Sequence, residues 1–227
     1  MIKYDILIPA YNAEKTLAEL LEEIKGLPDL PSHLIIVDDG STDKTAEIAL
    51  QFTDHLLQNK EREGKGFALR QGFDQFLTHS AADYLICLDA DLQHPPQSIL
   101  EFLKKAEHNS SSILIGKRGR KVREMPLLRI LSNTITSLVL SLLTGQKIED
   151  SQCGFRMIKR EVLTELKLCE NGFQLESEFI LKASRKGYRL EFVDIPTIYG
   201  NHPSNIDHLG DTLRFIKLVW NYLVHQL

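Results

Sequence analysis

The sequence has few cysteines and no long hydrophobic run, and each absence excludes a class of protein. Three cysteines, at positions 87, 153 and 169, cannot all pair within one chain. The N-terminal residues lack the apolar stretch of a secretory signal, so this sparse cysteine content predicts a reducing, cytoplasmic location. No run of about 20 apolar residues occurs, which excludes a membrane-spanning helix. Any membrane contact is therefore expected to be peripheral, at the inner face of the membrane.

An excess of positive charge is also missing. The 27 Lys and Arg residues and 31 Asp and Glu residues give a formal net charge of −4, which argues against nucleic-acid binding because that usually needs a basic face. Apolar residues make up 43% of the 227 residues, enough for a core, so we expect one folded domain over residues 1–227. The exception in charge is a basic cluster in one short stretch, at Lys117, Arg118, Arg120, Lys121 and Arg123.

Apolar periodicity predicts alternating strands and helices in the first half of the chain. Strands are expected at residues 4–8, 33–37, 55–57, 84–88 and 113–115, with helices at 15–24, 44–52, 65–78 and 97–107. Apolar strands joined by helices are typical of an α/β fold with a mostly parallel sheet and helices on both faces. The second half is less regular, with helices expected at 130–143, 173–186 and 212–225 and a strand at 189–194.

Polar clusters follow three of these strands, at residues 9–12, 38–40 and 89–93. In parallel sheets, ligands bind at the carboxyl ends of the strands. We therefore expect the three clusters to meet at one edge of the sheet and to form a binding site.

Asp89 and Asp91 lie one residue apart, directly after an apolar strand. Carboxylates this close repel each other unless a cation lies between them. Mg²⁺ and Mn²⁺ bind one or two carboxylates together with substrate phosphates, and Gln93 adds a neutral oxygen. The alternative is a solvated turn in which the aspartates cap the next helix, which is the more common outcome for an isolated Asp-x-Asp.

Asp38 and Asp39 end the second strand in the same way. Carboxylates at this position can accept hydrogen bonds from a nucleobase or from a ribose hydroxyl. Helix capping is the alternative, and it explains Ser41 or Asp43 more easily than it explains the Asp38–Asp39 pair.

The segments IPAYNAE (8–14), VDDGSTD (37–43), GKG (64–66) and LDADLQHPP (88–96) occur in the order seen in family-two glycosyltransferases. The sequence resembles the branch that contains dolichol-phosphate mannosyltransferase and bacterial polyprenyl-phosphate glycosyltransferases. CGFR (153–156), after Asp150, and GFQLESE (172–178) also resemble that branch. The similarity extends from about residue 4 to residue 205.

The resemblance implies a GT-A fold, which is Rossmann-like, with a nucleotide-sugar half at about residues 1–116. An acceptor half at about residues 117–227 would include the C-terminal helix. The donor, of the GDP-mannose or UDP-glucose type, would be bound by Pro9, Tyr11, Glu14, Asp38, Asp39, Lys65 and Asp89. Mg²⁺ or Mn²⁺ would be held against the donor diphosphate by Asp89, Asp91 and Gln93, and would stabilise the departing nucleoside diphosphate.

The resemblance also implies catalytic roles for Asp91, Arg118 and Glu176. The basic stretch at residues 117–123 would form a loop that closes over the donor phosphates. For this stretch, a solvated face or a contact with anionic lipid is an equal alternative.

The sequence departs from the family pattern at the acceptor side. Many inverting members carry a Glu-Asp pair whose Asp deprotonates an acceptor hydroxyl, whereas this chain has Glu176 followed by Ser177. A phosphate acceptor is already ionised and needs no base, so Ser177 favours inverting transfer to a polyprenyl phosphate. Glu178 is an alternative base. The mannosyltransferase branch usually has an Arg and a Ser-Lys pair after the last strand, where this chain has YGNHPSN (199–205), so the sugar and the acceptor stay open.

Two other functions remain as alternatives: transfer to a sugar hydroxyl in cell-surface polysaccharide synthesis, and a non-catalytic nucleotide- or lipid-binding module. A binding module would have a degraded metal motif, but Asp89, Asp91 and Gln93 are all present. The apolar segments at 130–143 and 213–224 would pack on the domain, on a second subunit in an oligomer, or on a membrane surface.

Overall fold

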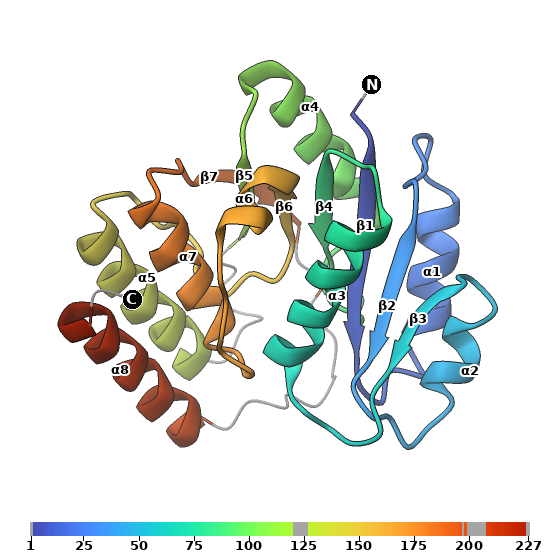
Figure 1. Ribbon diagram of the computed structural model, residues 1–227, viewed down its shortest axis with the longest axis horizontal. Helices are drawn as coiled ribbons and strands as arrows, with labels where there is room; N and C mark the ends of the chain where they lie inside the picture. Colours follow the sequence, from blue (N-terminus) through green and yellow to red (C-terminus); the bar gives the residue numbers. More distant parts are fainter. Residues whose placement is uncertain (1, 120–126, 197, 199–207, 226–227) are drawn as a thin grey trace.

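The computed structural model describes residues 2–119, 127–196, 198 and 208–225. A seven-stranded sheet runs through the molecule in the order β3-β2-β1-β4-β6-β5-β7 (Figure 1). Its strands are β1 (Tyr4–Ala10), β2 (Leu34–Asp38), β3 (His55–Gln58), β4 (Tyr84–Cys87), β5 (Ile113–Arg118), β6 (Arg156–Lys159) and β7 (Glu191–Ile195). All neighbouring strands are parallel except β6, which is antiparallel to both β4 and β5. The mostly parallel α/β sheet expected from the sequence is confirmed.

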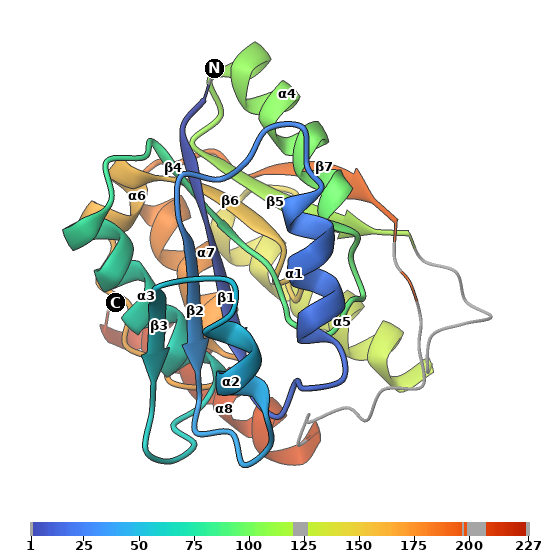
Figure 2. The same cartoon turned by 90° about the vertical axis from the view of Figure 1, so that its right-hand side faces the viewer.

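The helices cover both faces of this sheet, as predicted. They are α1 (Leu17–Lys25), α2 (Thr45–Ala49), α3 (Lys65–His79), α4 (Ile99–Asn109), α5 (Leu127–Thr144), α6 (Arg160–Glu165), α7 (Leu175–Arg185) and α8 (His208–His225), with a 3₁₀ turn η1 (Pro96–Ser98) before α4. Figure 2 shows α1 and α3 on opposite sides of β1 and β2. Helices α5, α7 and α8 lie next to one another beside the sheet (Figure 1), with α7 in contact with both α5 and α8.

Close packing of α3 on β1 fixes the start of α3, which carries a predicted donor residue. Gly72 faces Leu7 so closely that an added Cβ would lie 2.2 Å from the leucine side chain. Glycine is therefore needed for the helix to approach the strand. Lys65, at the first turn of the same helix, is held near the carboxyl ends of the strands by this contact.

All strands and helices expected from the sequence are present, but β6 and α6 were not predicted. β6 has only four residues, and its first is Arg156, so it shows neither an apolar run nor strict alternation. The short helix α6 follows it without a turn. In the sheet, β6 lies between β4 and β5 and is antiparallel to both.

The basic stretch at 117–123 does not begin with a loop. Lys117 and Arg118 are the last residues of β5. Lys117 Nζ forms ion pairs with Glu149 at 2.7 Å and Asp194 at 3.4 Å. For these two residues, the prediction of a loop that closes over the donor phosphates is wrong, because they belong to a strand and acidic side chains from distant segments neutralise them. Residues 120–126 lie outside the described part of the chain, as do residues 199–205.

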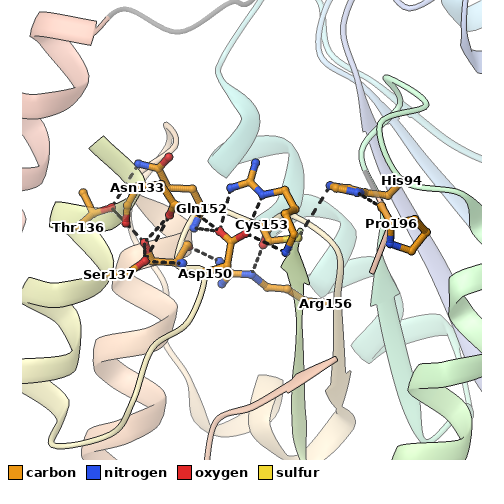
Figure 3. A network of polar contacts seen from close by, with 11 residues as sticks. His94, Asn133, Thr136, Ser137, Asp150, Gln152, Cys153, Arg156 and Pro196 are labelled. Carbon is orange, nitrogen blue, oxygen red and sulfur yellow. Dashed lines mark hydrogen bonds and ion pairs between the residues drawn. The ribbon is translucent and has the colours of Figure 1, made fainter. Parts of the chain in front are cut away.

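Arg118 belongs to a buried polar network that joins β5, α5 and the segment before β6. Asp150 accepts hydrogen bonds from Arg118 Nε at 2.7 Å and Nη2 at 2.8 Å, and from Asn133 Nδ2 at 3.0 Å. Figure 3 shows the network continuing to Ser137, and to Arg156, which donates to the backbone oxygen of Cys153 at 2.9 Å. The network links β5 to α5 and to the segment before β6, and it fixes the position of the Arg118 side chain.

Burial alone would raise the pKa of Asp150, but the hydrogen bonds and charge of Arg118 more than offset it and hold this pKa below its ordinary value. The same pairing raises the pKa of Arg118 against the opposing effect of burial, so Arg118 stays charged. Because the folded-state pKa of Asp150 is depressed, its carboxylate contributes stability above its unfolded-state pKa. That contribution is lost as pH falls through the folded-state value.

No helix in the described ranges is both long enough and apolar enough to cross a membrane. Helices α5 and α8 are instead amphipathic. Each has a buried leucine, Leu140 in α5 and Leu218 in α8. Each also carries exposed apolar residues, namely Ile135, Leu138, Leu142, Leu213, Ile216, Trp220, Leu223 and Val224. These helices therefore pack on the domain through one side and leave apolar surface on the other.

Replacing Asp150 with Asn should destabilise the protein by about 3–5 kcal/mol at neutral pH, because Arg118 would keep a buried charge without its counter-ion. The difference in unfolding free energy between wild type and D150N should shrink as pH falls below about 4, the ordinary pKa that this carboxyl has in the unfolded chain, and should be lost once pH passes below the depressed folded-state pKa. Urea unfolding between about pH 7 and pH 2 would measure this, with the exposed residue Asp74 changed to Asn as the control. A destabilisation that is the same at all pH values would contradict the assignment.

Candidate active site

The carboxyl ends of β1, β2 and β4 open into one cavity of about 1240 Å³. Of the residues predicted to bind donor or metal, those lining it are Pro9, Tyr11, Glu14, Asp39, Lys65, Asp89, Asp91 and Gln93. Arg118 and Glu176, predicted to be catalytic, also line it. The three polar clusters therefore meet at one site, as the strand-end argument requires.

Asp38 is the predicted donor residue that does not line this cavity. Its side chain is fully buried at the end of β2, and Oδ1 accepts the backbone N–H of Ser41 at 3.1 Å. Within the described residues, its Oδ2 has no hydrogen-bond partner. Gly40, with φ +73°, turns the chain away from the strand at this point. Asp38 therefore lies in the turn after β2, whereas Asp39 lines the cavity.

Asp39 holds the segment that leads into α3. Its Oδ1 accepts hydrogen bonds from Asn59 Nδ2 at 3.0 Å and from the Glu63 N–H at 2.9 Å. Its Oδ2 accepts the N–H of Gly64 at 2.8 Å. Each carboxylate oxygen has two lone pairs, so the group can accept a further donor from a ligand in the cavity.

Tyr11 and Arg62 form a flat surface on the cavity wall. The Arg62 guanidinium lies 4.3 Å from the centre of the Tyr11 ring, and both residues line the cavity. A stacked arginine and tyrosine present faces on which a nucleobase can pack. Sequence reasoning missed Arg62, because it lies in an irregular segment with no local pattern, between β3 and Gly64.

Lys65 lies between two carboxylates from opposite halves of the chain. Its Nζ is 2.8 Å from Asp89 Oδ1 and 2.8 Å from Glu176 Oε1. Burial alone would lower the pKa of Lys65, but the charges of Asp89 and Glu176 more than offset this and raise it. Burial would raise the pKa of Asp89, and Lys65 instead holds it below the ordinary range. Lys65 and Asp89 are therefore both charged at neutral pH.

Gly154 fixes the other side of the Asp89 carboxylate. A Cβ at position 154 would lie 2.5 Å from Asp89 Oδ2, so only glycine leaves room for this carboxylate. The glycine belongs to the CGFR segment that the sequence comparison singled out. Asp89 is thus oriented by Lys65 from one side and by the backbone of residue 154 from the other.

The loop after β4 offers oxygen ligands that fit a hard divalent cation. Asp91 Oδ1 accepts the backbone N–H of Gln93 at 3.0 Å, and Leu92 between them has φ +57°. No three His, Cys, Asp or Glu side chains in the described ranges gather closely enough to enclose a metal alone. Mg²⁺ and Mn²⁺ need only one or two carboxylates when substrate phosphates complete the shell. Asp89, Asp91 and Gln93 therefore fit a metal that is bound together with a diphosphate.

The cavity continues into an apolar groove between α5 and α8. Its walls there are Ile135, Thr136 and Val139 of α5 and Phe215, Ile216, Val219, Trp220 and Leu223 of α8. Ile216 and Trp220 are also exposed to solvent, at 57% and 65%. The groove is consequently open to solvent at these two residues.

The acidic residues at the start of α7 have different surroundings. Glu176 lines the cavity, is 5% exposed and pairs with Lys65. Ser177 beside it also lines the cavity and is 7% exposed. Glu178, considered above as an alternative base, does not line it. The Glu178 carboxylate accepts the backbone N–H groups of Cys169 and Glu170 and pairs with Lys182. The prediction that Glu178 can replace a base is therefore wrong.

Residues 5–167 match the family model described as glycosyl transferase family 2. The chain is 29% identical to the dolichol-phosphate mannosyltransferase of Pyrococcus furiosus, over 99% of this chain and 62% of that protein. It is 33% identical to the undecaprenyl-phosphate 4-deoxy-4-formamido-L-arabinose transferase of Photorhabdus laumondii, over 74% of this chain and 52% of that protein. The chain thus spans less than two thirds of the length of each of these two relatives.

Among solved structures, the chain resembles glucosyl-3-phosphoglycerate synthase from Mycobacterium tuberculosis in complex with Mn²⁺, UDP and glucosyl-3-phosphoglycerate. The TM-score is 0.73 at 22% identity, over 96% of this chain and 78% of that one. This likeness confirms the GT-A fold. The relatives agree with the polyprenyl-phosphate branch expected from the motifs. Because the family model covers well over half of the sequence, the chain belongs to glycosyl transferase family 2 and is a glycosyltransferase.

Proposed function

We propose that this chain transfers a hexose from a nucleotide sugar of the GDP-mannose or UDP-glucose type to a polyprenyl phosphate, with inversion at the anomeric carbon. The observation that carries the proposal is the shape of the cavity. One space joins the polar strand ends around Asp91 to the apolar groove between α5 and α8. A substrate with an anionic head and a long apolar tail fits such a space better than a sugar does.

The first half of the chain, residues 1–116, provides the donor part of this site. Tyr11 and Arg62, which stack on each other, would pack against the nucleobase, and the Asp39 carboxylate would accept its N–H. Pro9 and Glu14 line the same wall. Asp91, Gln93 and Asp89 would hold Mg²⁺ or Mn²⁺ against the diphosphate. When bound, the metal supplies Lewis-acid stabilisation of the departing nucleoside diphosphate.

The second half, residues 117–227, provides the acceptor part. Arg118 stays cationic on the cavity wall, since Asp150 fixes its guanidinium, and it would attract the acceptor phosphate. Glu176 is already engaged by Lys65 at 2.8 Å, and Ser177 beside it has no carboxylate to act as a base. A phosphate oxygen is already ionised and attacks the anomeric carbon without a base, so the pairing of Glu176 fits a phosphate acceptor.

The relatives support the same acceptor class. Their names describe transfer to dolichol phosphate and undecaprenyl phosphate, both of which are polyprenyl phosphates. The exposed apolar residues of α5 and α8 flank the groove. We therefore propose that these two helices rest on the inner face of a membrane, so that the lipid tail can stay in the bilayer while its phosphate enters the cavity.

The direct test offers radiolabelled GDP- and UDP-sugars with short polyprenyl phosphates in detergent, beside a panel of free sugars and glycans. We expect label only on the polyprenyl phosphate. Transfer to a sugar hydroxyl instead, lost when Glu176 or the cavity residue Asp211 is changed to its amide, would contradict the lipid acceptor and support the polysaccharide alternative.

The apolar groove leads to a prediction about the acceptor tail, which can be tested with a matched control residue on the same helix, α8. Ile216 and Leu213 are both exposed on α8, but only Ile216 lines the cavity. Ile216→Gln should raise the KM for polyprenyl phosphate by about tenfold, the loss expected from one apolar side chain in contact with the tail. Leu213→Gln should leave this KM unchanged in detergent. Equal effects of the two changes would contradict a tail site in the groove.

Asp91→Ala should abolish transfer and weaken Mn²⁺-dependent nucleotide binding by more than about 100-fold, since it removes a ligand rather than a supporting group. The fold should remain intact, because Asp91 lies in a loop after β4. Calorimetry with Mn²⁺ and UDP or GDP measures the binding. Asp83→Ala is the control, since Asp83 is exposed at the other end of the same strand. Unchanged affinity in D91A would remove Asp91 from the metal site.

A further inference from the structure

The ammonium of Lys65 occupies the place where a divalent cation would be attracted. Asp89 Oδ1 and Glu176 Oε1 lie on either side of this nitrogen, each at 2.8 Å. The side chains of Lys65, Asp89 and Glu176 are 19%, 27% and 7% exposed, so little water screens them. Two carboxylates facing each other at a cavity wall would bind Mg²⁺ or Mn²⁺ if the ammonium were absent.

The lysine is held in this position from several directions. Gly64 and Gly66, on either side of it, pack so closely on residues 170–172 that a Cβ on either would lie 2.6 Å from a backbone oxygen. The N–H of Phe67 donates to the Asn171 carbonyl at 3.0 Å. The Lys65 ammonium also lies 5.8 Å from the centre of the Phe173 ring. The start of α3 is therefore fitted against the start of α7, which fixes the ammonium between Asp89 and Glu176.

We propose that Lys65 is a resident counter-cation that keeps the metal ion from binding alone and makes metal binding depend on the donor. The proposal rests on the function given above. Asp91 and Gln93 supply too few ligands for firm metal binding while Lys65 engages Asp89. The donor diphosphate brings oxygen ligands and negative charge, so metal and nucleotide bind together. By linkage, each then strengthens the binding of the other by the same factor.

A purely structural role for Lys65, as a tie between α3 and α7, predicts a different result. Loss of such a tie would lower stability and weaken all binding. Loss of a counter-cation would instead strengthen the binding of the metal alone. The two roles therefore change metal affinity in opposite directions.

The test uses isothermal titration of Mn²⁺ into wild type, Lys65→Met and Lys60→Met, first without nucleotide and then with saturating UDP or GDP. Methionine keeps most of the length of the lysine side chain and removes its charge. K65M should bind Mn²⁺ alone at least about tenfold more tightly than wild type, because two carboxylates lose their nearest cation. The factor by which nucleotide strengthens Mn²⁺ binding should fall by a similar amount. K60M, which removes an exposed charge from the preceding segment, should behave as wild type.

Unchanged or weaker binding of Mn²⁺ alone to folded K65M would overturn the proposal, as would an equal gain in K60M. If K65M does not fold, Glu176→Gln decides the question. Lys65 would then belong to Asp89 alone, so E176Q should bind Mn²⁺ alone more weakly than wild type, and tighter binding would contradict the proposal. A chain that binds no nucleotide would refute the proposed function, yet the titration of Mn²⁺ alone would still show whether Lys65 excludes the metal.

Discussion

Four carboxylates at or beside the cavity are largely buried, and they depend on cations or N–H groups supplied by a distant part of the chain. Asp150 depends on Arg118, Asp89 and Glu176 share Lys65, and Asp39 accepts N–H groups from the segment before α3. A charge removed from water in this way is tolerated only when such partners are held at hydrogen-bond distance. The packing of α3, α5 and α7 around the sheet serves this requirement.

The same contacts join the first half of the chain to the second half across the cavity. Lys65 belongs to α3, which packs on β1 and β2, whereas Glu176 begins α7 in the second half. Arg156 of β6 donates to the backbone oxygen of Glu176 at 3.1 Å, and Gly154 just before it shapes the space for Asp89. The antiparallel strand β6 therefore connects the two halves, and the position of Glu176 relative to Asp89 follows from this strand.

The sequence predicted what depends on local patterns. Apolar runs located β1 to β5, and the rule that parallel strands end at one edge brought Asp39, Asp89 and Asp91 to one site. It could not predict pairings between distant residues. Arg118 was expected in a phosphate loop because five cations lie close together, whereas Asp150, 32 positions later, fixes it in the structure. Asp38 was placed in the pocket because it shares a strand end with Asp39, although its carboxylate is buried in the turn. Arg62 and β6 were missed because neither has a local pattern.

The groove between α5 and α8 shows why acceptor chemistry is harder to infer than donor chemistry. Donor groups follow strand ends, where the chain direction fixes their position. The groove depends instead on how two helices, separated by more than 60 residues and both in contact with α7, are placed relative to each other. Apolar periodicity in each helix predicts a buried side but does not distinguish a core from a ligand groove. Only the assembled structure shows that residues of both helices line the same space as Asp91, and the proposal of a lipid-phosphate acceptor rests on that geometry.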